Sequence, residues 1–225
     1  MTRFVPRKSH EAATASADLK SNIRTQKKQT DILNAATQLF LERGYDAVSL
    51  DDIVELVGGS KTTLYSYYGG KEGLFAAAIQ KMCRDKLGPL LAMDVTDFDP
   101  KSGLHAIGTQ FLLLVSDGEG QAIFRTMISE ARRFPELAST FFAAGPEATI
   151  RLLRRNIEHW QKKGLLRSGN PEIFAIQFLG VIMGNFHLKC QLGLLDSLTE
   201  KQINAWVVRG TELFLEGALS PHGRM

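Results

Sequence analysis

Apolar residues recur at steps of three and four along most of the chain, which is the spacing of one face of an α-helix. No segment alternates apolar and polar residues for long enough to predict a strand. The first clear helix is predicted over residues 27–43, and Gly44 follows at a position where a left-handed residue commonly ends a helix. Its apolar face holds Ile32, Ala35, Ala36, Leu39 and Phe40. The pattern therefore predicts an all-α protein.

Capping residues and glycines divide the next part of the chain into three helices. Ser49 and Ser60 stand where an N-cap hydroxyl is needed, and Asp52 completes the sequence of a capping box with Ser49. The helices predicted from these signals span residues 50–57, 61–67 and 71–87.

The remainder of the chain is also predicted to be helical. Prolines at first helical positions and side chains that can act as N-caps mark several starts. Gly145–Pro146 is expected to break one long helical segment. The predicted helices span residues 100–115, 119–133, 135–163 with this break, 171–192 and 199–217.

Positive charge is concentrated in the first part of the chain. Residues 1–86 hold 13 Lys and Arg against 10 Asp and Glu, whereas residues 87–225 hold 14 of each. This distribution indicates an anionic partner that touches one end only. Residues 1–26 are basic and show no helical stripe, so they are predicted to form a flexible arm. Such an arm is either a disordered tail or a segment that strengthens binding to phosphates.

Two short helices joined by a glycine-containing turn have the dimensions of a helix-turn-helix motif. In that motif the second helix enters the DNA major groove, and its N-terminal residues face the base edges. Lys61, Thr62 and Thr63 hold these positions, and their ammonium, hydroxyl and methyl groups suit base contacts. The side chains predicted to approach phosphates are Ser60, Tyr65, Tyr67 and Lys71.

The segment "ILNAATQLFLERGYDAVSLDDIVELVGGSKTTLYSYYGGKEGLFAAAI" resembles the N-terminal domain of the TetR family of bacterial transcriptional regulators. The resemblance implies an all-helical dimer, DNA binding by the first three helices and a C-terminal ligand-binding domain. It adds Ser49 to the DNA-facing residues and makes Leu64 the buried anchor of the recognition helix. Two residues depart from the family pattern: Gly59 replaces a β-branched residue, and Tyr68 replaces a buried phenylalanine.

The second half carries a further resemblance in "FRTMISEARRFPELASTFFAAGPEATI", which is similar to the C-terminal domain of AefR-like repressors. We therefore expect a flexible arm (1–26), a DNA-binding domain (27–70) and a helical regulatory, ligand-binding and dimerisation domain (71–225). The predicted ligand-binding residues are His105, Phe124, Met127, Trp160 and Phe178, and for the aromatic ones ordinary core packing is the alternative. The predicted dimer-interface residues, on helices 171–192 and 199–217, are Phe178, Gly180, Gly184, Trp206 and Phe214.

The sequence thus predicts a ligand-responsive DNA-binding regulator, a repressor that a small apolar molecule releases from double-stranded operator DNA. It is expected to act as a homodimer in the cytoplasm, without cofactor or metal. Two alternatives stay open: a helical enzyme with a basic accessory domain, and a DNA-binding module without an effector. No catalytic triad, carboxylate pair or phosphate-binding loop supports the enzyme. The apolar run 173–188 is interrupted by polar residues and is shorter than the ~20 residues that span a bilayer.

Overall fold

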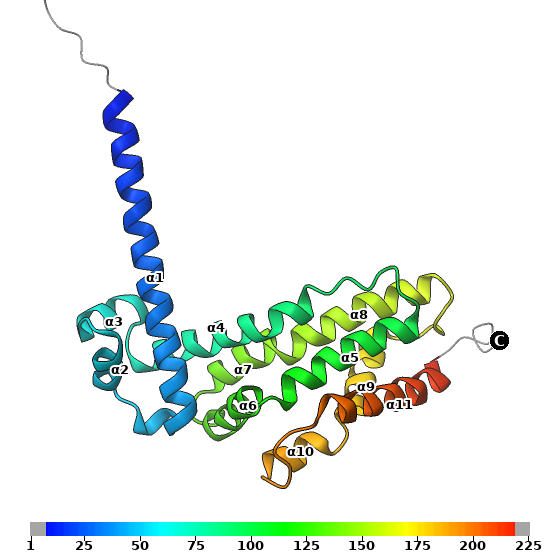
Figure 1. Cartoon of the computed structure of the whole chain (residues 1–225). Coiled ribbons are helices and arrows are strands. Elements are labelled where there is room, and N and C mark those ends of the chain that lie inside the picture. Colours follow the sequence, from blue (N-terminus) through cyan, green and yellow to red (C-terminus); the bar gives the residue numbers. More distant parts are fainter. Residues whose placement is uncertain (1–7, 219–225) are drawn as a thin grey trace, which may run out of the picture. The chain divides into compact units, whose positions relative to one another are not determined.

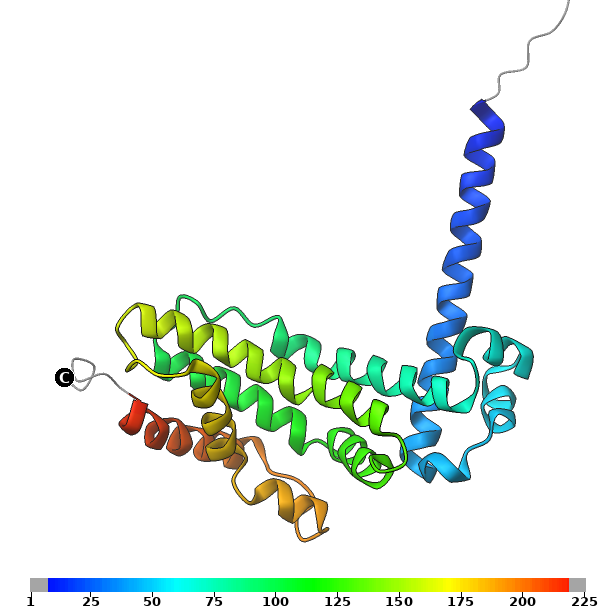
Figure 2. The same ribbon diagram turned by 180° about the vertical axis from the view of Figure 1, so that it is seen from behind.

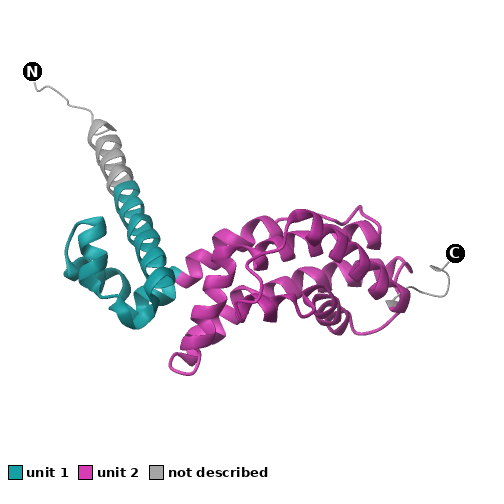
Figure 3. Ribbon diagram, turned by 60° about the horizontal axis from the view of Figure 1, so that its bottom comes forward, with its two compact units in different colours: residues 1–78 teal, residues 79–225 magenta. Residues whose placement is uncertain are grey.

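The prediction of an all-α fold is confirmed. A computed structural model describes residues 8–218, with side chains described for residues 22–217. Within residues 8–218 the chain forms eleven helices and no β-strand. It divides into two compact units, residues 1–78 and 79–225 (Figure 3).

Helix α1 spans Lys8–Ala47 (Figure 1), so the start predicted at residue 27 is wrong. Residues 8–26 include four alanines and contain no proline or glycine, so the segment can form a helix even where no apolar stripe marks one. The regular helix ends where predicted, because Gly44 takes φ +79°. Ile32, Ala36 and Phe40 are buried on the predicted face.

Helices α2 (Leu50–Val57) and α3 (Lys61–Tyr68) form the predicted pair. The capping box is present: Ser49 Oγ accepts a hydrogen bond from the Asp52 N–H at 3.2 Å, and the Asp52 carboxylate accepts one from the Ser49 N–H at 2.6 Å. Ser60 Oγ caps α3 by accepting from the Thr63 N–H at 3.3 Å. Both helices therefore begin at the residues that can satisfy their free N–H groups.

Helix α4 (Lys71–Leu91) belongs to both compact units. Near its start Phe75 packs against Phe40 and Tyr45, with ring centroids 4.9 Å apart in each pair. These contacts explain why the first unit extends to Ala78, past the domain end at residue 70 that the paired glycines suggested.

The second unit is a bundle of helices, drawn from opposite sides in Figures 1 and 2. Helix α8 packs against α7 and α9, α11 packs against α5 and α9, and α10 contacts α5 and α6. No helix in the part of the chain that the structure describes is both long and apolar enough to cross a membrane. The bounds are α5 Pro100–Ser116, α6 Gly118–Glu130, α7 Pro135–Ala144, α8 Pro146–Lys162, α9 Pro171–Met183, α10 Phe186–Gln191 and α11 Glu200–Ala218.

The single helix predicted over residues 171–192 is wrong, because the chain forms α9 and α10 there. Gly184 takes φ +50° and ends α9. Its N–H still bonds to the Gly180 carbonyl at 3.0 Å, and the chain then turns into the short α10. A glycine inside an apolar run thus serves as a helix end.

Gly73, in the first turn of α4, provides a test of the α3–α4 packing. A Cβ at this position would lie 1.8 Å from the Tyr68 carbonyl oxygen, so the backbones could not stay as they are. We expect Gly73→Ala to lower the free energy of unfolding by about 1–3 kcal/mol in urea titrations. The control is Gly118→Ala, where nothing lies within 4 Å, and it should change stability by less than about 1 kcal/mol. Equal effects of the two substitutions would contradict this packing argument.

Candidate nucleic-acid interface and apolar cavity

The first turn of α3 is accessible to solvent, and the helix is anchored by a buried leucine. Leu64 is only 2% exposed and anchors the helix, as the sequence predicts. Lys61 and Thr62 are exposed and Thr63 is half-buried. The three residues predicted to face base edges therefore lie together at the accessible N-terminal end of the helix.

A surface groove of about 370 Å³ runs beside this turn. We call it the α3 groove, and it is lined by residues 46–51 together with Lys61, Tyr65 and Lys71. It brings together four predicted DNA-contacting residues: Ser49, Lys61, Tyr65 and Lys71. The other four do not line it: Ser60, Thr62, Thr63 and Tyr67. A sugar–phosphate strand is a chemically suitable occupant, because two ammonium groups and hydroxyls converge on the groove.

Both lysines of the α3 groove have partners within the chain. Lys61 Nζ lies 2.7 Å from the Asp51 carboxylate, and this hydrogen-bonded pair raises the pKa of Lys61. Lys71 Nζ donates to the Asp46 carbonyl at 3.3 Å and lies 4.3 Å from the centre of the Tyr45 ring. Exposed contacts of this kind are weak, so a phosphate can compete for either ammonium group.

Ser49 and Ser60 act first as helix caps. The Ser49 hydroxyl hydrogen-bonds to Asp52 at 2.5 Å, and this bond, with the Ser49 N–H bond and nearby Arg43, lowers the pKa of the Asp52 carboxyl. Ser60 Oγ lies 3.1 Å from Thr63 Oγ1. Their side chains thus fix the N-terminal ends of α2 and α3 near the α3 groove.

The two departures from the family pattern are both accommodated. Tyr68 donates its hydroxyl to the Gln29 carbonyl of α1 at 3.3 Å, and burial raises the pKa of this phenol. Gly58 and Gly59 form the turn between α2 and α3 with φ +68° and +117°. A β-branched residue at position 59 would be strained in that conformation. The glycine therefore suits a different turn geometry from the one the family pattern implies.

Lys28 is a candidate interface residue that the sequence reasoning missed. Its Nζ lies 3.0 Å from the point that a Cβ on Gly59 would occupy, so α1 brings an ammonium group to the α2–α3 turn. The available signal was the pair Lys27–Lys28 ahead of the apolar stripe. The pair falls at the start of the predicted helix 27–43, and periodicity alone does not show that it approaches the turn.

The second unit contains a mainly apolar cavity of about 150 Å³ that is partly open to the surface. Its wall includes aromatic side chains from three helices, namely Phe111, Phe124 and Phe141. Helix α4 contributes Cys83, Lys86 and Leu87. Burial raises the pKa of the Cys83 thiol to about 11, so this group is neutral at pH 7.

One of the five predicted ligand-binding residues, Phe124, lines this cavity. Met127, Trp160 and Phe178 are core residues outside its lining, and the Trp160 indole N–H donates to the Phe98 carbonyl at 3.0 Å. His105 lies elsewhere, with Nε2 3.0 Å from the Asn204 amide oxygen. Met127, Trp160 and Phe178 therefore fill the core, and one sequence cannot separate such residues from those that line a cavity. His105 lines a different surface hollow, of about 370 Å³.

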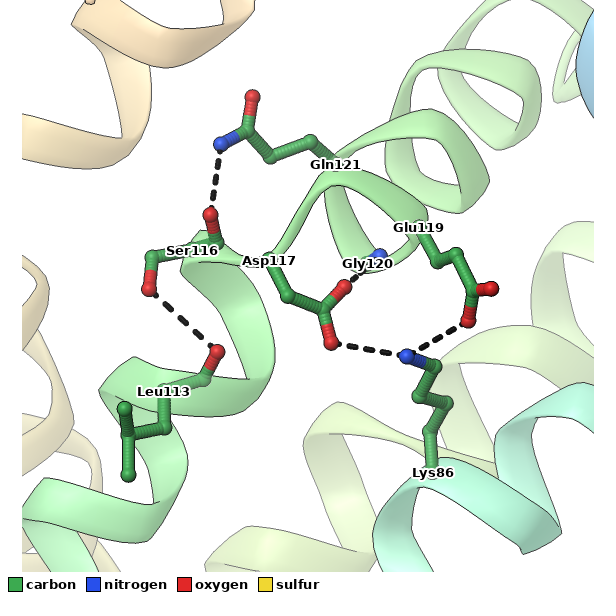
Figure 4. A network of polar contacts seen from close by, with 7 residues as sticks. All are labelled: Lys86, Leu113, Ser116, Asp117, Glu119, Gly120 and Gln121. Atoms are coloured by element: carbon green, nitrogen blue, oxygen red, sulfur yellow. Dashed lines mark hydrogen bonds and ion pairs between the residues drawn. The ribbon is translucent and has the colours of Figure 1, made fainter. Parts of the chain in front are cut away.

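A network of polar contacts, which we call the polar corner, adjoins the cavity through Lys86 (Figure 4). Lys86 Nζ lies 2.8 Å from the Asp117 carboxylate and 2.6 Å from the Glu119 carboxylate. Asp117 also caps α6 by accepting from the Gly120 N–H at 2.5 Å. Burial opposes the charge on Lys86, but its hydrogen bonds to the two carboxylates outweigh it and raise the pKa of the ammonium group. The corner ties α4 to the start of α6.

The predicted dimer-interface residues fall into two groups. Phe178 and Phe214 pack against each other inside the chain, with ring centroids 5.3 Å apart, so their assignment to an interface is wrong. Gly184 is the end of α9, and a Cβ there would lie 2.7 Å from the Trp206 ring. Gly180 is open to solvent and Trp206 is 42% exposed, so both can meet a second copy.

Comparison with known proteins extends over both units. Residues 32–78 match bacterial regulatory proteins of the tetR family. Residues 102–217 match the C-terminal domain of AefR-like transcriptional repressors.

Similar individual proteins agree with these matches. YvkB, an uncharacterized HTH-type transcriptional regulator of Bacillus subtilis, is 26% identical over 186 residues, covering 83% of this chain and 94% of YvkB. The structure of the flavonoid-responsive regulator FrrA is 35% identical with a TM-score of 0.76, covering 87% of this chain and 99% of FrrA. A TetR transcriptional regulator from Agrobacterium tumefaciens shares the fold, with a TM-score of 0.71, 23% identity and coverage of 87% and 96%.

Proposed function

The chain belongs to the TetR family of bacterial transcriptional regulators, and from this premise we propose that it is a repressor that a small apolar ligand releases from its operator. As a family member it is a DNA-binding transcriptional regulator and not an enzyme. The observation that carries the proposal is the exposed first turn of α3, held on buried Leu64 beside the α3 groove. We infer that it acts in the cytoplasm, where a bacterial regulator meets operator DNA.

We assign two kinds of DNA contact to the first unit. Thr62 and Thr63 meet base edges in the major groove, because they lie in the first turn of the recognition helix. Lys28 and Lys71 meet phosphates, because their ammonium groups lie at the α2–α3 turn and in the α3 groove. Lys61, which the sequence placed among the residues that face base edges, is reassigned to a phosphate because it lines the same groove.

The size of the cavity and the course of α4 support release of DNA by a ligand. A volume of about 150 Å³ is close to that of an engineered cavity that binds benzene, so a larger ligand that is buried completely must displace the walls. One wall is α4, which continues into the DNA-binding unit. A ligand that prefers the displaced wall shifts the population toward that conformation by its differential affinity. FrrA, the 35% identical relative, is named as flavonoid-responsive, which supports an aromatic ligand of this kind.

Homodimer formation is supported by an apolar surface on α9 and α11. Ile173 and Ile176 are each 50% exposed on α9, and Leu213 on α11 is 63% exposed. Trp206 and Gly180 lie on the same two helices. Exposed apolar side chains gathered in this way commonly mark an interface, so we assign α9 and α11 to a symmetric contact of four helices.

A salt titration of operator and scrambled-DNA affinity tests the assigned contacts. Thr62→Ala should weaken the preference for the operator sequence at one or two base pairs by about 1–3 kcal/mol. It should leave unchanged the salt slope, which is the slope of log affinity against log salt concentration. Lys71→Ala should weaken binding to both DNAs alike and reduce the slope by about 0.9 per half-site. Thermal unfolding is the control, since Lys71 also contacts Asp46. The placement of α3 is wrong if Lys71→Ala changes sequence preference while Thr62→Ala does not.

Asp51 should act against DNA binding. Its carboxylate holds Lys61 at 2.7 Å and repels phosphates in the α3 groove. We expect Asp51→Asn to raise operator affinity several-fold at low salt and less at high salt, as fluorescence anisotropy can measure. Glu55→Gln removes a charge from the same helix outside the groove lining and should have a smaller effect. A fall in affinity with Asp51→Asn would mean that Asp51 positions Lys61 for DNA.

Gly180 provides the test of the dimer. Nothing lies within 4 Å of a Cβ at this position, so Gly180→Arg leaves the packing of its own chain intact, whereas Gly184 cannot be replaced without strain. We expect Gly180→Arg to weaken dimerisation in sedimentation velocity and to lower operator affinity in parallel. Gly118→Arg, at another open helical glycine, is the control. If Gly180→Arg stays dimeric at the lowest concentrations measured, α9 does not form the interface.

A further inference from the structure

His187 is the polar residue in the cavity wall whose hydrogen-bonding capacity is unused. It lies on α10, and its ring meets that of Phe124 edge-on at 4.3 Å, with 80° between the planes. Both imidazole nitrogens are buried, and neither has a hydrogen-bond partner among the residues that the structure describes. The other described side chains with buried, unpartnered polar atoms lie outside the cavity lining, and these are Thr109, His159, Gln191 and Thr211.

The other polar groups of the cavity wall are engaged. Lys86 is bound by Asp117 and Glu119, and the Thr149 hydroxyl donates to the Gly145 carbonyl at 3.2 Å. The Cys83 thiol is neutral and only a weak donor. A ligand that fills this space therefore finds one strong hydrogen-bonding partner, the imidazole of His187.

The charge state of the wall favours a neutral ligand. Burial lowers the pKa of His187, so at pH 7 its imidazole is neutral, with one nitrogen donating and the other accepting. Lys86 already faces two carboxylates, which leaves no positive charge to balance an anion. A hydroxyl group suits the imidazole because it can either donate or accept.

We propose that His187 selects the effector, which is a neutral aromatic compound whose hydroxyl group hydrogen-bonds to the imidazole while its ring packs among Phe111, Phe124 and Phe141. The proposal rests on the assignment of this cavity as the effector site. It supplies what that assignment lacks, namely the chemical class of the ligand and the residue that recognises it. An aromatic ligand is favoured over an aliphatic chain of equal volume, because its ring can stack on the three phenylalanine rings or meet them edge-on.

Three probes of nearly equal size separate these requirements: 4-propylphenol, propylbenzene and 4-propylbenzoate. Isothermal titration of the full-length protein should give about tenfold tighter binding of 4-propylphenol than of propylbenzene, since the phenol satisfies a buried polar group. 4-Propylbenzoate should bind more weakly than the phenol. His187→Phe should abolish the preference for the phenol and keep the affinity for propylbenzene. His159→Phe, the same replacement at a histidine outside the cavity lining, should leave the preference intact.

A second measurement does not depend on the folding of a variant. Nitrogen NMR of the wild-type protein should show a change at the His187 imidazole with 4-propylphenol and none with propylbenzene. The inference is overturned if 4-propylphenol and propylbenzene bind equally, if neither binds, or if the benzoate binds most tightly. Operator release, measured in parallel by anisotropy, separates the two proposals: a phenol that binds through His187 without releasing DNA supports His187 and contradicts ligand-induced release.

Discussion

The aromatic cluster of Phe40, Tyr45 and Phe75 is the contact on which the rest of the first unit depends. It joins three segments: the regular part of α1, the end of α1 that follows Gly44, and the start of α4. Because these three segments surround α2 and α3 in the chain, the cluster fixes the frame in which the recognition helix is held. Lys71 adds an electrostatic contact at the edge of the same cluster, over the Tyr45 ring. A single group of side chains therefore supports the helix end, the α3 groove and the first turn of α4.

Helix α4, which begins in this cluster, also forms part of the cavity wall farther along its length. Residues near the middle of α4, Cys83, Lys86 and Leu87, line the space in which we place the effector. The polar corner of Lys86, Asp117 and Glu119 holds this wall to α6. A ligand that enlarges the cavity must therefore work against a compact apolar contact and an ion-paired corner. The free energy for this comes from its own aromatic packing and hydrogen bonding.

Sequence predicted best where a local chemical rule decides the structure. Ser49 with Asp52, and Ser60 alone, started α2 and α3 at the residues expected, because a free N–H group needs an acceptor wherever it lies. Gly44 ended its helix for an equally local reason. The helix end at Gly184 was not predicted, because a glycine in an apolar run can either pack against a neighbouring helix or end its own, and the sequence pattern is the same in both cases. Lys28 and His187 were missed because their roles arise from contacts across the fold, with the α2–α3 turn and with Phe124, that periodicity does not encode.

The pairing of Lys61 with Asp51 bears on how the protein searches a genome. Non-specific binding to DNA comes almost wholly from phosphate contacts, and a bacterial chromosome offers on the order of a million competing sites. A carboxylate beside the recognition helix weakens attraction to every phosphate backbone and leaves the threonines free to distinguish bases. The protein thereby gives up some affinity everywhere and spends less time on wrong sites. Because this loss is the same on the operator and elsewhere, the ratio of the two affinities is unchanged, and the consequence of Asp51 is faster exchange between sites.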